Sequence, residues 1–210
     1  MTPPTIDIPE LAERARRLRG DDGGRALLGI VGCPGAGKST LSARLGRLLG
    51  DRAVIVPMDG FHLDNPVLET LGRRGRKGAI DTFDVAGFVS LLVRLAAAEE
   101  AVTYAPRFDR SLETSVGSAI AVPREVPLVI VEGLYLLARE HGWERVRPLL
   151  DEVWYLEVPT EERIRRLVAR RMRSGEDEAT ATDWVLGVDQ NNAARVEGTR
   201  EHADLIVELP

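Results

Sequence analysis

One stretch decides the fold of this 210-residue chain: Gly32-Cys33-Pro34-Gly35-Ala36-Gly37-Lys38-Ser39-Thr40. It fits a phosphate-binding pattern of a glycine, four free positions, then glycine, lysine and serine or threonine. The glycines let the backbone turn with its N–H groups facing inward, so the loop can wrap a phosphate. We predict that all nine residues line a site for a nucleoside triphosphate. Lys38 would reach the outer phosphates, and the Ser39 hydroxyl would ligate magnesium.

The segments on either side of this loop have the order that such a motif requires. Residues 25–31 read as a short buried strand. The segment after the loop has apolar residues at helical spacing: Leu41, Leu45, Leu48 and Leu49. A helix that begins near Lys38 directs the positive end of its dipole at the same phosphate. Strand, loop and helix together therefore support the nucleotide site.

Strands and helices alternate along the rest of the chain. Further buried strands are expected at residues 53–56, 128–131, 153–158 and 204–209. Helices are expected from Pro9 to Gly20, after capping residues Asp84 and Thr160, and from about Thr182. Two short edge strands, 103–109 and 119–122, flank a polar loop. This alternation predicts one three-layer α/β domain, residues 1–210, with a central parallel sheet.

Composition narrows the possible functions. Apolar residues make up 44% of the chain and charged residues 29%, which is ordinary for a soluble globular protein. The net charge of −5 argues against a nucleic-acid partner. No apolar run has the length of a membrane span and no signal sequence opens the chain, so we expect no membrane partner and a cytoplasmic location. The single cysteine, Cys33, excludes internal disulfides.

Two acidic residues follow predicted strands, at the ends where a parallel sheet binds its ligands. Asp59 comes just after the strand 53–56 and is suited to hold a substrate hydroxyl and take its proton. Glu132 follows four aliphatic residues and is a candidate to organise magnesium or its water. A structural role is the alternative for Asp59, and a solvent-facing loop position for Glu132.

The segment after Thr160 is predicted to be a helix with two distinct faces. Its buried stripe is formed by Ile164, Leu167, Val168 and Met172. The arginines are expected elsewhere on its surface: Arg163, Arg166, Arg170 and Arg173. Such a cluster can neutralise charge that develops on a transferred group. A solvated helix face is the alternative for any single arginine.

Taken together, these features resemble the uridine kinase, phosphoribulokinase and bacterial pantothenate kinase superfamily, within the P-loop kinases. The matching signatures, in the superfamily's order, are Met58-Asp59-Gly60-Phe61-His62, Arg76-Lys77-Gly78 with Asp81 and Phe83-Asp84, Glu132-Gly133-Leu134, and Thr199-Arg200-Glu201. The resemblance covers residues 27–209. It is strongest to the bacterial branch labelled fructose-transport-system kinase, or nucleoside/nucleotide kinase-like.

The resemblance implies a P-loop NTPase fold with sheet order 2-3-1-4-5 and a mobile helical lid at about residues 163–181. It also implies ATP with Mg²⁺, and transfer of the γ-phosphate to a hydroxyl of a small-molecule acceptor. Asp59 corresponds to the carboxylate that activates this hydroxyl. Arg166 and Arg170 fall in the lid, so the expected catalytic residues are Lys38, Asp59, Arg166 and Arg170. Dimers are common among relatives, and a homodimer is one expected state.

Several residues are expected on the acceptor side of the site. Tyr104, Arg107 and Phe108 correspond to positions where relatives contact the acceptor, and Asn191 and Asn192 to positions that contact substrate or adenine. His62 is suited to hydrogen-bond the acceptor. These candidates are His62, Tyr104, Arg107, Phe108 and Asn191, beside Asp59 itself. The run Asp-Gly-Phe-His replaces the Asp-Ser-Phe-Tyr that uridine kinases tend to show, which weakens an assignment to uridine.

Three functional classes remain open at this point. The first is a kinase that phosphorylates a sugar such as fructose, a nucleoside or a pantothenate-like alcohol. The second is a regulatory P-loop NTPase, and the third is a nucleotide-sensing subunit of a sugar transport system. The chain has no Asn-Lys-x-Asp run for guanine recognition. A pure sensor does not need an acceptor base such as Asp59, so the kinase is the expected function.

Overall fold

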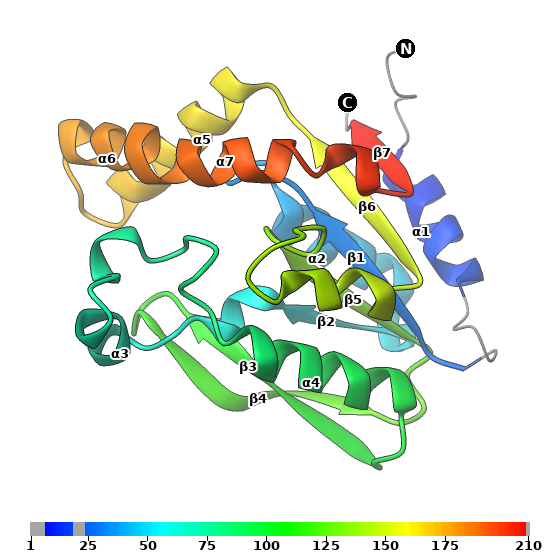
Figure 1. The fold of residues 1–210 in the computed structure, drawn as a ribbon. Helices are drawn as coiled ribbons and strands as arrows, with labels where there is room; N and C mark the ends of the chain where they lie inside the picture. Colours follow the sequence, from blue (N-terminus) through cyan, green and yellow to red (C-terminus); the bar gives the residue numbers. More distant parts are fainter. Residues whose placement is uncertain (1–6, 19–23, 209–210) are drawn as a thin grey trace.

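A five-stranded parallel sheet forms the centre of the computed structural model, which describes residues 7–18 and 24–208 (Figure 1). Its order is β2-β5-β1-β6-β7. The strands are β1 (Ala26–Val31), β2 (Ala53–Pro57), β5 (Leu128–Gly133), β6 (Glu152–Glu157) and β7 (Leu205–Glu208). Counted along the chain within this sheet, the order reads 2-3-1-4-5, as the resemblance implied. Leu209, expected in the last strand, lies outside the described residues.

Helices cover both faces of the sheet, which confirms the three-layer α/β fold (Figure 1). The helices are α1 (Ile8–Arg17), α2 (Lys38–Leu49), α3 (Asn65–Thr70), α4 (Val85–Ala97), α5 (Thr160–Arg173), α6 (Glu178–Trp184) and α7 (Gln190–Glu197). Alternate residues of β1 point to opposite faces. Leu28 packs in a core cluster with α1 and α2, whereas Leu27 packs in a second cluster with α4 and α7.

The helical lid is formed by α5 and α6, followed by a π-helical segment, Val185–Asp189, that leads into α7. The helix expected from Thr182 therefore begins earlier, because the side chain of Asp177 caps α6 by accepting from the Thr180 N–H. No helix in residues 7–18 and 24–208 combines the length and apolar character needed to cross a membrane.

Three predicted side-chain positions in the helices were wrong, and the expected end of the first helix lies outside the described residues. Arg163 is not a surface residue of α5: it is buried, because its guanidinium binds the Val158 carbonyl, the Thr160 hydroxyl and the Glu197 carboxylate. Met172 is 43% exposed, since the last turns of α5 extend beyond the sheet (Figure 1). Leu48 lies at the edge of the α2 stripe and is 44% exposed. Helix α1 ends at Arg17, and its expected end, Gly20, lies outside the described residues.

The strands β3 (Val102–Asp109) and β4 (Thr114–Pro123) pair with each other in a separate antiparallel sheet. Strand β4 is longer than the expected 119–122, because pairing continues from Thr114. The register shifts between Ala105 and Arg107, which lets the two strands stay paired past an irregularity. This β3–β4 hairpin lies beside the central sheet and reaches the end of β2 (Figure 1).

Two glycines allow the hairpin and β5 to pack closely around the short turn Met58–Phe61 that follows β2. A Cβ atom on Gly60 would lie 2.5 Å from the carbonyl oxygen of Pro106 in β3. A Cβ atom on Gly133 would lie 2.7 Å from the Cβ of Met58, which is fully buried. The turn that carries Asp59 is therefore held between the central sheet and the hairpin.

We predict that Gly60→Ala lowers the free energy of unfolding by about 1–3 kcal/mol, because the added methyl group overpacks the contact with the hairpin. Urea unfolding followed by circular dichroism measures the change. Gly117→Ala in β4 is the matched control, since a Cβ there meets no atom within 4 Å. Equal stability of the Gly60→Ala variant and the wild type would contradict this account of the packing.

Candidate active site

The phosphate loop connects β1 to α2 and uses two glycines in the left-handed region. Gly35 and Gly37 have φ values of 79° and 94°, a left-handed region that glycine adopts without a Cβ clash. A Cβ on Gly35 would also lie 2.7 Å from the carbonyl oxygen of Arg163, so the first turn of α5 packs directly on the loop. The loop and the N-terminus of α2 together form an anion-binding concavity.

The ammonium of Lys38 lies across this loop. Its Nζ donates to the carbonyl oxygens of Gly32, at 2.8 Å, and Cys33, at 3.2 Å. Burial lowers the pKa of Lys38, while the carboxylates of Glu132 and Asp59 oppose this shift. The lysine is thus positioned at the loop with two acidic groups close enough to influence its charge.

Glu132 lies at the carboxyl end of β5 and is buried. Its Oε1 accepts a hydrogen bond of 2.9 Å from the hydroxyl of Ser39 in the first turn of α2. Burial raises the pKa of Glu132, and Asp59 adds to this, whereas Lys38 and the Ser39 hydroxyl act in the opposite direction. A hydroxyl and a carboxylate oxygen are the ligands that Mg²⁺ prefers beside phosphate. The donor set at Ser39 and Glu132 therefore fits magnesium.

Asp59 follows β2 and faces the same end of the sheet. The parallel register places Pro57 of β2 opposite Glu132, which brings the two acidic residues to one edge. The Asp59 side chain is 33% exposed, and its Oδ2 lies 3.4 Å from an Nη of Arg110. A partly exposed carboxylate beside a phosphate loop is suited to accept a proton from a bound hydroxyl.

His62 and Phe108, two of the residues expected to contact the acceptor, lie against each other. The His62 ring lies between the rings of Phe83 and Phe108, with centroid distances of 4.1 and 4.9 Å. Its Nδ1 is 2.8 Å from the backbone oxygen of Asp59. Burial lowers the pKa of His62, so the ring is neutral at neutral pH. Lys77 places its Nζ 4.9 Å from the Phe108 ring centroid.

Other expected acceptor residues do not reach Asp59 in this structure. Tyr104 and Arg107 have exposed side chains on β3. The hairpin residue in contact with Asp59 is instead Arg110, in the turn after β3. The sequence holds no local signal for Arg110, because only the packing of the hairpin against Met58–Phe61 brings it there.

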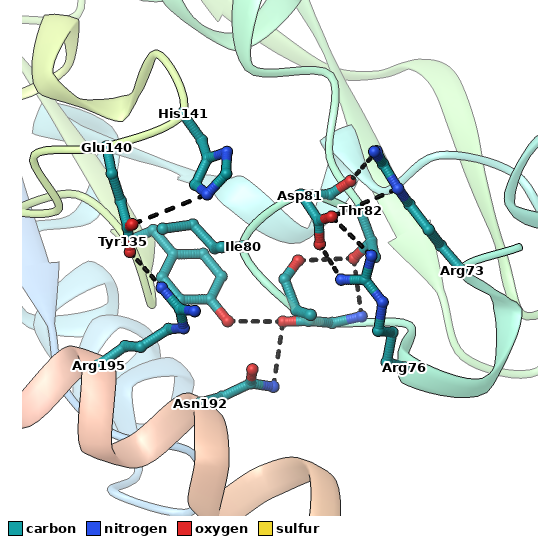
Figure 2. Close-up of polar contacts among 12 residues, drawn as sticks. Arg73, Arg76, Ile80, Asp81, Thr82, Tyr135, Glu140, His141, Asn192 and Arg195 are labelled. Atoms are coloured by element: carbon teal, nitrogen blue, oxygen red, sulfur yellow. Dashed lines mark hydrogen bonds and ion pairs between the residues drawn. The ribbon is translucent and has the colours of Figure 1, made fainter. Parts of the chain in front are cut away.

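The basic loop before α4 is anchored to α7 by one carbonyl group, that of Gly78. The Tyr135 hydroxyl and the Asn192 Nδ2 both donate to it, at 2.8 and 3.2 Å (Figure 2). Asn192 is buried, whereas the predicted substrate residue Asn191 is exposed. We interpret Asn192 as a residue that holds the loop. Asp81 pairs with two arginines of the same loop, Arg73 and Arg76 (Figure 2).

The arginines of α5 divide into different roles. Arg166 lies over the phosphate loop, with an Nη 3.5 Å from the Ala36 carbonyl oxygen and its Nε 2.7 Å from Glu162. Burial lowers the pKa of Arg170 and the nearby Arg110 adds to this, while Asp189 and Asp59 oppose it. The charge of Asp59 therefore acts on Arg170. Arg173 bonds the backbone of its own helix, through the carbonyl of Ala169.

A cavity of about 870 Å³ opens beside the phosphate loop. Its lining includes residues of the loop, of α2, of β6, of α5 and of the turn that follows α7: Gly37, Thr40, Arg44, Tyr155, Arg166 and Arg200. Asp59, His62 and Phe108 do not line it. The cavity thus lies on the side of the loop that faces α2 and β6. Asp59 belongs to a different part of the site, outside this cavity.

Proteins with similar sequences and structures are named as kinases, which agrees with the phosphate loop found here. No family model matches the chain. A Schizosaccharomyces pombe protein named "putative uridine kinase" is 34% identical over 180 residues, which cover 80% of this chain and 75% of the relative. A crystal structure of a "putative fructose transport system kinase" from a Silicibacter species is 38% identical with a TM-score of 0.88, covering 96% of this chain and 98% of that one.

A more distant structure shares the fold alone. Phosphoribulokinase from Rhodobacter spheroides is 15% identical with a TM-score of 0.64, and the match covers 88% of this chain and 70% of that one. Three findings point to one family. They are the phosphate loop with Lys38 and Ser39, the parallel sheet, and the sequence identity to the named relatives. The chain therefore belongs to the uridine kinase, phosphoribulokinase and pantothenate kinase superfamily of P-loop, ATP-dependent kinases.

Proposed function

We propose that this kinase transfers the γ-phosphate of ATP to an alcohol group of a small molecule such as a sugar, a nucleoside or a pantothenate-like alcohol. The observation that carries the proposal is the convergence of Lys38, Glu132 and Asp59 at the carboxyl ends of β1, β5 and β2. Lys38 and Glu132 suit the phosphates and their metal, and Asp59 suits an acceptor hydroxyl. The names of the relatives, which refer to uridine and to fructose transport, support the class of acceptor.

Each residue has a role that its position supports. The loop N–H groups and Lys38 bind the phosphates, and the cavity between α2 and β6 has room for the nucleoside. Ser39 and Glu132 would hold Mg²⁺, which supplies positive charge to the phosphate oxygens when bound. Arg166 and Arg170 would stabilise charge on the transferred group.

Asp59 would orient the acceptor hydroxyl and accept its proton. In the proposed reaction the acceptor oxygen forms a bond to the γ-phosphorus, and the bond from that phosphorus to the β–γ bridging oxygen breaks. The hydroxyl proton moves to Asp59, and ADP leaves with the bridging oxygen. Positioning and charge stabilisation supply most of the rate in phosphoryl transfer, so the base must lie close to the loop.

We predict that Lys38→Ala lowers kcat/KM by about 100- to 1000-fold or more, because the transition state loses a fixed positive charge. A coupled assay of ADP release measures the loss, and circular dichroism checks that the fold is kept. Lys77→Ala is the matched control, because Lys77 is the only other lysine and bonds Asn65 and Glu113. That variant should keep its affinity for ATP. Near-normal turnover in Lys38→Ala would contradict the assignment of the loop.

A second prediction separates the metal ligand from the base. Glu132→Gln should raise the magnesium concentration needed for half-maximal activity, because a neutral amide binds the cation more weakly than a carboxylate does. Asp59→Asn should leave this concentration nearly unchanged. Magnesium titrations of both variants, each at saturating ATP, give the comparison. The same shift in both variants would count against separate roles.

The decisive prediction concerns Asp59 and tests kinase against regulatory NTPase. Asp59→Asn should abolish ADP formation that depends on an acceptor, whereas ATP affinity should change little because other groups bind the nucleotide. The measurements are ADP release with and without an acceptor found by screening alcohols, and ATP binding by calorimetry. Hydrolysis by the wild type that no alcohol stimulates would favour a regulatory NTPase. Strongly weakened ATP binding in Asp59→Asn would move this residue to the nucleotide side.

A further inference from the structure

The contact between Arg110 and Asp59 is unusual for a residue proposed as a base. Arg110 lies in the turn that follows β3, and its guanidinium reaches back to the Asp59 carboxylate at 3.4 Å. A hydroxyl that binds Asp59 would share the carboxylate with this guanidinium, which contacts its Oδ2. The side chain of Arg110 is 61% exposed, so it can turn toward a bound molecule without disrupting a core.

Three basic residues of the loop before α4 have partners within the chain. Arg73 and Arg76 both pair with Asp81, at the edge of the loop shown in Figure 2. Lys77 donates to the Asn65 side chain and to the Glu113 carbonyl. Among these four basic residues, Arg110 is the one whose ion pair joins it to the proposed base itself.

A second guanidinium adds to the positive charge near Arg110. Burial lowers the pKa of Arg170, and the positive charge of Arg110 adds to this shift. Asp189 and Asp59 act on Arg170 in the opposite direction. Asp59 thus contacts the hairpin arginine, Arg110, and its charge also acts on the lid arginine, Arg170.

We propose that the acceptor carries an anionic group, a carboxylate or a phosphate, and that Arg110 binds this group while the acceptor hydroxyl binds Asp59. The inference rests on the proposed kinase function and names the chemical class of its acceptor. A guanidinium binds carboxylate and phosphate with two parallel N–H donors, which a neutral polyol cannot match. When Arg110 leaves the Asp59 carboxylate, the anionic group of the acceptor takes the place of that carboxylate. A neutral acceptor offers no such group, so the guanidinium would lose its anionic partner.

In this proposal, binding of the acceptor also frees the Asp59 carboxylate from its ion pair with Arg110. When Arg110 turns to the anionic group, both oxygens of Asp59 become accessible to the hydroxyl. A hydrogen bond between charged groups contributes more than a neutral one, so the loss of Arg110 should be visible in binding. Selectivity should therefore appear mainly in the KM for the acceptor.

Three matched pairs of acceptors test the charge requirement: D-glycerate and glycerol, pantothenate and pantothenol, fructose 1-phosphate and fructose. ADP release by the wild-type chain is measured with each compound at saturating ATP and magnesium. We expect stimulation by an anionic member, with kcat/KM at least about tenfold above that of its neutral partner. Equal or better use of the neutral partners would overturn the inference while leaving the kinase function intact.

Variants of Arg110 test the assigned residue. Arg110→Gln should raise KM for the anionic acceptor about 10- to 100-fold, with the ATP affinity unchanged, and Arg110→Lys should recover part of the loss. The neutral partner should be used as well as before. The control is Arg124→Gln, an arginine just past the other end of β4 that bonds the backbone of Glu99 and Glu100. It should behave as the wild type does.

The outcomes separate the two hypotheses. A ratio of anionic to neutral kcat/KM that is the same in Arg110→Gln and the wild type would overturn the role of Arg110. ADP release that no compound of either charge stimulates would overturn the kinase function, and with it the inference. A lower ratio of anionic to neutral kcat/KM in Arg110→Gln, with an unchanged ratio in Arg124→Gln, would support the kinase function and the role of Arg110.

Discussion

The site depends on one close contact, between the backbone of Gly35 in the phosphate loop and the carbonyl group of Arg163. There is no space for a side chain at Gly35, because a Cβ would lie 2.7 Å from that oxygen. The buried guanidinium of Arg163 then bonds the Val158 carbonyl, the Thr160 hydroxyl and the Glu197 carboxylate. The end of β6, the first turn of α5 and the end of α7 are thus tied together behind the loop.

This contact also sets which arginines can act on phosphate. Arg163, Arg166 and Arg170 follow one another at spacings of three and four residues, so they share one face of α5. Arg163 holds the loop, and the guanidinium of Arg166 reaches the Ala36 carbonyl within it. The third, Arg170, feels the charge of Asp59. One helix face therefore provides both the support for the loop and the positive charge proposed to act on the transferred group.

The groups proposed to act on phosphate and those proposed to bind the acceptor come from different parts of the fold. The parallel sheet presents the loop, Glu132 and Asp59 at its carboxyl edge, as sheets of this class do. The antiparallel hairpin adds Phe108 and Arg110, and it packs on the sheet through the missing side chain of Gly60. Because loops and hairpins vary more easily than a buried sheet, this division allows the acceptor to change while the phosphate site is retained.

The sequence alone was enough to predict the phosphate loop, the sheet order by resemblance, and the position of Asp59 at a strand end. These features depend on local pattern: glycine spacing permits the loop, and parallel strands bring their carboxyl ends to one edge. Tertiary structure alone decided that Asn192, and not Asn191, faces the interior, and that Arg110 meets Asp59. Arg110 and Asp59 are 51 residues apart, and no local pattern encodes a contact made by two separately folded segments.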